Sequence, residues 1–179
     1  MPEWKSFTFG EDGEATPTAP APTPAVTPAM EPDEFAAKWG TEVSEVTIAR
    51  IEAVVEGDGL PHGSNEFIVA TQLEGVSFQV HREPVDVPWA QIETRIVPPG
   101  EGHTEASLQA IANRWNNEHL QPTVFPIEDG ENWVLVAASR FFVGEGLSDR
   151  QIHAMLRRGL VIGVSAAHEL PALFEESVE

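Results

Sequence analysis

The sequence contains no cysteine and only two lysines, Lys5 and Lys38, and both lysines precede the region that we predict to fold. The absence of cysteine excludes disulfides, thiolate metal sites and a cysteine nucleophile. The scarcity of lysine argues against a nucleotide-binding enzyme, because phosphate-binding loops commonly lead into a helix that carries a lysine. Both glycine-rich segments, 57–59 and 144–146, contain an acid and lead into no such helix.

Long apolar runs are also missing. Charged residues or glycines break every run well before the ~18 residues that a membrane-spanning helix needs. The first residues, MPEWKSFTFGEDGE, do not show the basic stretch and apolar stretch of a secretory signal peptide. Since cysteines, which would suggest an oxidising compartment, are absent as well, we expect a cytoplasmic protein that does not bind membranes.

The chain is strongly acidic, with a formal net charge of −19 over 179 residues. Such a surface repels the phosphates of nucleic acids and of anionic membranes, so we expect neither as a partner. Two interpretations of the charge remain open. It can serve solubility alone, or it can match a basic protein partner.

The first 42 residues differ in composition from the rest. Residues 15–30 read ATPTAPAPTPAVTPAM, in which proline removes backbone donors and large core-forming residues are absent. We therefore predict a disordered, acidic and proline-rich arm over 1–42, and an ordered domain over 43–179. Trp4, Phe7 and Phe9 make a candidate linear recognition motif in this arm; alternatively, they fold back on the domain or remain loose.

Hydrophobic periodicity and capping residues predict three helices, which begin after Thr47, Thr104 and Ser148. Alternating runs bounded by turn residues predict five strands, at 67–73, 76–82, 91–97, 123–128 and 132–140. The element order is α-β-β-β-α-β-β-α. Because strands follow one another in runs, the sequence predicts an α+β fold with helices packed on an antiparallel sheet of about five strands.

Short motifs at three places resemble the YbjN family of bacterial proteins. They are Asn113-Arg114-Trp115-Asn116 on the second predicted helix, the hairpin sequence EDGENWVLV, and Gly146-Leu147-Ser148 at the start of the last helix. The resemblance covers residues 43–175. It implies a small α+β protein whose fold is similar to type III secretion chaperones, and a regulatory or chaperone-like binding role without an established enzymatic activity.

No pattern of catalytic or metal-binding residues emerges from the sequence. The six histidines show no zinc-binding spacing, and no serine lies in a nucleophile elbow. No acid lies in an apolar run where burial would raise its pKa. We therefore expect no cofactor, no metal and no enzyme, although a small-ligand binder or an enzyme with a pocket under the sheet remains the alternative.

Two polar groups have open interpretations. Asn113 and Asn116 share one helix face, and their amides either tie the helix to the sheet or contact a ligand. Trp115 lies beside them on the predicted buried face of the helix. Arg150, Arg157 and Arg158 make the only basic cluster of the sequence. They either balance local charge and the helix dipole, or they bind an anion or an acidic peptide.

Exposed aromatic residues are the main candidates for a partner surface. Phe141 and Phe142 are adjacent in a strand, so one of them faces outward, and Trp89 lies near the start of another strand. With the arginine cluster, these aromatic residues are our candidate contacts for a protein partner or client. The leading hypothesis is a protein-binding module, and a homodimer is a further possibility.

Overall fold

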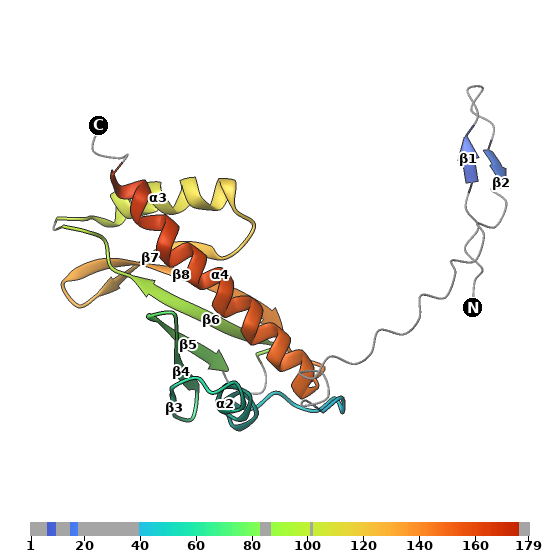
Figure 1. Ribbon diagram of the computed structural model, residues 1–179. Coiled ribbons are helices and arrows are strands. Elements are labelled where there is room, and N and C mark those ends of the chain that lie inside the picture. Colours follow the sequence, from blue (N-terminus) through green and yellow to red (C-terminus); the bar gives the residue numbers. More distant parts are fainter. Residues whose placement is uncertain (1–6, 10–14, 18–39, 83–86, 101, 176–179) are drawn as a thin grey trace. The chain divides into compact units, whose positions relative to one another are not determined.

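In a computed structural model of the chain, the described residues are 7–9, 15–17, 40–82, 87–100 and 102–175 (Figure 1). The chain forms two compact units, Met1–Ala37 and Lys38–Glu179. In the first unit, strands β1 (Phe7–Phe9) and β2 (Ala15–Pro17) pair antiparallel. Trp4 and most of the proline-rich segment lie outside the described residues, so the disorder and the recognition motif of the arm stay predictions.

The second unit contains a sheet of six antiparallel strands in the order β3-β4-β5-β6-β8-β7. The strands are β3 (His62–Ser64), β4 (Ile68–Leu73), β5 (Val76–Arg82), β6 (Trp89–Ile96), β7 (Thr123–Asp129) and β8 (Asn132–Phe142). The predicted α+β fold and its five strands are therefore confirmed. The sixth strand, β3, was missed because its three residues are exposed and lack the alternation that marks a half-buried strand.

In the described residues of this unit, three helices accompany the sheet: α2 (Ile48–Gly57), α3 (Glu105–Glu118) and α4 (Asp149–Glu175). Each begins after the predicted capping residue. The hydroxyl groups of Thr47, Thr104 and Ser148 accept a hydrogen bond from the backbone N–H three residues further on, at 3.3, 3.2 and 3.3 Å. These bonds satisfy donors that the first turn of a helix leaves without partners.

Helix α4 is a single helix of 27 residues that passes over the sheet without a break. A Cβ atom on Gly159 would overlap the side chain of Ile92, and one on Gly163 would overlap the ring of Phe78. The two glycines thus allow the helix to approach strands β6 and β5 closely. In the part of the chain that the structure describes, no helix is both long and apolar enough to cross a membrane.

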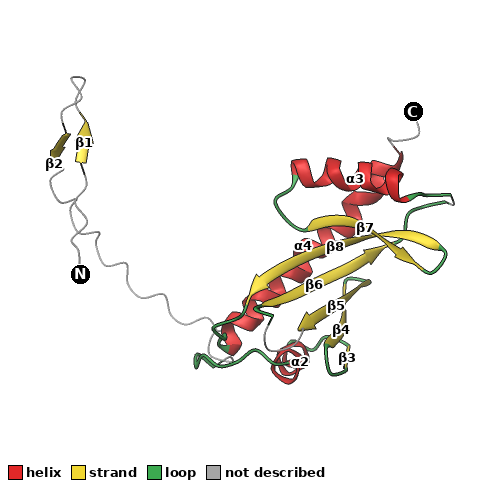
Figure 2. Cartoon of the chain, turned by 180° about the vertical axis from the view of Figure 1, so that it is seen from behind, coloured by secondary structure: helices red, strands yellow, loops and turns green. Residues whose placement is uncertain are grey.

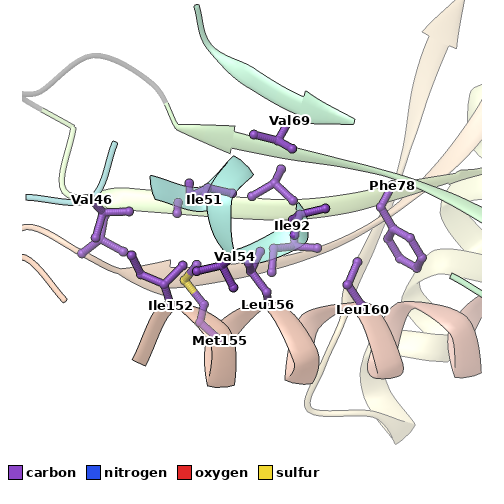
Figure 3. Close-up of a cluster of buried hydrophobic side chains, with 14 of the residues drawn as sticks. Val46, Ile51, Val54, Val69, Phe78, Ile92, Ile152, Met155, Leu156 and Leu160 are labelled. Atoms are coloured by element: carbon purple, nitrogen blue, oxygen red, sulfur yellow. The ribbon is translucent and has the colours of Figure 1, made fainter. Parts of the chain in front are cut away.

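All three helices lie on one face of the sheet. Helix α4 crosses in front of β6 and β8 in Figure 1, and these strands lie in front of it in the reverse view of Figure 2. Two clusters of buried apolar side chains fill the space between helices and strands. Figure 3 shows the first, where Ile51, Val54 and Leu156 from the helices meet Val69 and Ile92 from the strands.

Two arginines hold the surrounding segments to this core. The Arg82 side chain is buried and donates to the backbone oxygens of Val46, at 3.0 Å, and of Val87, at 2.7 Å. The Arg50 guanidinium donates to the backbone oxygen of Leu147, at 2.8 Å, and to the carboxylate of Asp149. Arg82 therefore fixes the approach to β6, and Arg50 ties α2 to the start of α4.

Candidate functional site

The face of the sheet that points away from the helices carries the candidate site. Side chains alternate along a strand, so His81 of β5, Gln91 and Glu93 of β6 and Arg140 of β8 all point to this side, which we call the open face. The register pairs His81 with Gln91 and Gln91 with Arg140. Three neighbouring strands therefore bring these four residues together, and we refer to them as the polar row.

Hydrogen bonds connect most of the polar row. The Arg140 Nε–H donates to Gln91 Oε1 at 2.6 Å, and the Gln91 amide nitrogen donates to Glu93 Oε2 at 2.6 Å. The His81 Nε2 atom is buried and lies 3.2 Å from Glu93 Oε1, an ion-pair distance at which the ring is not aligned for a hydrogen bond. The Gln91 amide is thus held at both ends, and this fixes the direction of the Arg140 side chain.

Glu93 is the buried member of the polar row, with an exposed fraction of 9%. Burial raises the pKa of its carboxyl group, whereas the contacts with His81 and Gln91 and the charges of His81 and Arg95 lower it further than burial raises it. The net pKa is below the usual 4.5. The carboxylate is therefore ionised at neutral pH and acts as a fixed negative charge rather than as a proton donor.

Two large aromatic side chains lie beside the polar row. The register pairs Trp89 of β6 with Phe142 of β8, and their rings meet edge to face with centroids 5.5 Å apart. Trp89 is 46% exposed and Phe142 is 53% exposed. Neighbouring aromatic rings that are half exposed are typical of a surface that a partner covers, because their burial contributes strongly to binding.

Described residues of the open face line three hollows. One hollow of about 410 Å³ is lined by His81, Val87, Trp89, Gln91 and Arg140. A second, of about 320 Å³, borders β7 and β8, and a third, of about 240 Å³, borders β4, β5 and β6. Arg140 lines both the first and the second hollow, so its side chain stands between them.

The structure divides the candidate partner residues between two surfaces. Trp89 and Phe142 lie together on the open face, whereas Phe141 points to the helix side and is partly buried against the core. Arg150, Arg157 and Arg158 are exposed on α4, on the other side of the sheet. The aromatic residues and the arginine cluster therefore do not form one site.

The Asn-Arg-Trp-Asn segment of α3 holds the edge strand β7. The Asn116 amide donates to the backbone oxygen of Val124 at 2.7 Å and accepts from its N–H at 2.8 Å, as a neighbouring strand would. The Trp115 indole donates to the backbone oxygen of Pro122 at 3.0 Å. Asn113 is exposed and bonds only Gln109 of its own helix, at 2.9 Å, among the described residues. These contacts favour the structural interpretation for Asn116 and Trp115.

The polar row was not predicted from the sequence. One signal was available, because Gln91, Glu93 and Arg95 alternate with apolar or small residues and so mark a polar strand face. The burial of Glu93 could not be predicted from the sequence, because this burial depends on side chains of another strand. Within the described ranges, no three histidine or acidic side chains gather closely enough to bind a metal ion.

Comparison with known proteins identifies the family of this chain. The family described as "YbjN: Putative bacterial sensory transduction regulator" matches residues 47–170. The chain belongs to the YbjN family. A solved structure, "Crystal structure of YbjN, a putative transcription regulator from E. coli", is similar with a TM-score of 0.56 and 13% identity, over 76% of this chain and 96% of that chain. At this identity the likeness shows the fold alone, and no curated protein matches the sequence.

Proposed function

We propose that the protein is a non-enzymatic regulatory module, chaperone-like in manner, which holds a segment of a protein partner on the open face. The aromatic pair of Trp89 and Phe142 is the observation that carries this proposal. Half-exposed rings placed beside a hollow provide the central contacts that dominate the free energy of most protein interfaces. The description of the YbjN family as regulators supports the same role.

The edges of the sheet are less suited to a partner than its open face. At the β7 edge, Asn116 occupies the backbone groups of Val124, and Pro126 has no N–H to offer an added strand. At the opposite edge, β3 has three residues, which leaves few backbone groups to pair. We therefore place the partner against side chains of the open face rather than along an extended ladder.

The charge of the chain bears on the kind of partner. With a net charge of −19, the protein attracts basic segments, has little electrostatic effect on neutral ones and slows the approach of acidic ones. Arg150, Arg157 and Arg158 on the opposite side, and the arm with Trp4, Phe7 and Phe9, remain candidates for secondary contacts.

Selection from a displayed library of random linear peptides tests the proposal. Selected peptides should bind the wild type, and their affinity should fall about tenfold or more for Phe142→Ala and Trp89→Ala, as for the loss of a central interface residue. Phe67→Ala is the matched control, since Phe67 is 47% exposed but lines none of the described hollows. Peptides that bind Phe142→Ala and Trp89→Ala as tightly as the wild type would refute the role of the open face.

A second function has one observation in its favour. The hollow of about 410 Å³ has the size of a small-molecule pocket, and its polar lining groups are held in place. Native mass spectrometry of the purified protein distinguishes the two functions. A small molecule bound one-to-one, and lost from Arg140→Gln, would favour the ligand binder.

Self-association is the third candidate use of the same surface. If the aromatic pair covers a second copy of the chain, light scattering should show a dimer that becomes monomeric in Phe142→Ala. A monomer at all concentrations would leave the pair available to a different partner.

A further inference from the structure

Arg140 differs from Arg50, Arg82 and Arg95 in the groups that its guanidinium bonds. Arg50 and Arg95 bond the carboxylates of Asp149 and Asp129, and Arg82 bonds two backbone oxygens. The Arg140 guanidinium instead bonds a neutral amide, through Nε alone, and makes no ion pair among the described residues. An arginine that is held in position but not neutralised is typical of a site for an anion.

The surroundings of Arg140 define the ligand further. Among the described members of the polar row, the negative charge belongs to Glu93, whose carboxylate is already engaged by Gln91 and His81. One guanidinium without a counter-charge matches a single carboxylate. A phosphate, with nearly two charges, would be repelled more strongly by Glu93.

The spacing on β8 then specifies a sequence pattern. Arg140 and Phe142 are two residues apart, so they point to the same face about 7 Å from each other. An extended peptide presents its own side chains i and i+2 with the same spacing. One side chain can therefore meet Arg140 while the other packs on Trp89 and Phe142.

We propose that Arg140 binds the carboxylate of an aspartate or glutamate in the partner segment, two residues from a large apolar side chain that packs on the aromatic pair. This inference rests on the proposed function. The acid is a single one in an otherwise neutral or basic segment, because the net charge of the protein disfavours acidic partners.

Three labelled peptides that differ at one feature test the pattern by fluorescence polarisation. The first contains Lys-Phe-Thr-Glu-Lys, the second has glutamine in place of glutamate, and the third has glutamate directly after phenylalanine. The wild type should bind the first peptide about tenfold more tightly than the other two, since a charge-assisted bond is lost in the second and misplaced in the third.

Arg140→Gln should bind the first and second peptides equally. The double variant Arg140→Gln/Phe142→Ala should bind both peptides more weakly than Arg140→Gln does. Arg114→Gln is the matched control, because Arg114 is also exposed but lies on α3 and pairs with Glu118. This control should keep the tenfold preference for glutamate. Thermal unfolding of each variant verifies that the fold is intact.

The outcomes separate this inference from the proposed function. Equal binding of the first two peptides by the wild type, with dependence on Phe142, refutes the role of Arg140 and leaves the open face as a binding surface. Failure of all three peptides, while peptides selected from the library bind, refutes the pattern alone. Tighter binding of a phosphoserine peptide, or competition by free glutamate as strong as that by the first peptide, would show a different anion and also overturn the inference.

Discussion

The two faces of the sheet are built from the same strands but differ in almost every property. On the covered face, apolar side chains are buried beneath three helices. On the open face, a bonded polar row, two half-exposed rings and three hollows meet the solvent. Phe141 and Phe142 are neighbours in sequence and lie on opposite faces. Strand alternation thus separates the residues that stabilise the fold from those available for recognition.

The largest effect is expected on the covered face. Leu156→Ala should lower the free energy of unfolding by about 2–5 kcal/mol, because Leu156 is 1% exposed in the first apolar cluster and its truncation leaves a cavity. Urea denaturation monitored by circular dichroism measures this change. A loss below about 1 kcal/mol would show that the interface between α4 and the sheet is loosely packed.

Glu93 is expected to be an exception to this division between the faces. It belongs to the open face but is buried, so it should contribute to stability. Glu93→Gln should cost about 1–3 kcal/mol at pH 7, because it disturbs buried bonds of the polar row. The pKa of Glu93 is lowered in the folded state, so the unfolded state takes up the proton first and the stabilisation is lost as the pH falls below 4.5.

The difference in the free energy of unfolding between the wild type and Glu93→Gln should therefore be largest at neutral pH and smaller at roughly pH 3. Urea denaturation at both pH values measures it. Glu131→Gln, at an exposed position of the β7–β8 turn, is the control and should change little at either pH. A difference in the free energy of unfolding that stays constant down to pH 3 would contradict the lowered pKa of Glu93.

The edge of the sheet gives an intermediate effect. Asn116→Ala should cost about 1–2 kcal/mol because it removes two hydrogen bonds to Val124. Asn113→Ala, one turn earlier on the same helix, should stay within about 0.5 kcal/mol. Equal losses from the two substitutions would show that the helix rather than the edge strand depends on these amides.

The smallest effect on stability is expected from the aromatic pair. Phe142→Ala should lower the free energy of unfolding by less than about 1 kcal/mol, because half of the ring is already exposed to water. The same denaturation series as for Leu156→Ala measures it. A loss as large as that of Leu156→Ala would mean that the open face contributes to the core.

Local patterns predicted the fold well and the site only in part. Capping residues such as Thr47 and the turn at Glu74-Gly75 act within a few residues, so their structural consequences can be read from the sequence. The polar row depends on the register of three strands, and register is fixed only when the whole sheet assembles. For that reason the exposed aromatics could be named in advance, whereas their bonded neighbours could not.

Helix α4 has a mechanical consequence for recognition. It crosses the sheet without a break, and Gly159 and Gly163 allow it to pack closely on the side chains of Ile92 and Phe78. A helix packed in this way resists bending of the sheet, so the curvature of the open face is fixed before any partner binds. Under the proposed function, association would then require little rearrangement, and more of the contact energy would remain as affinity.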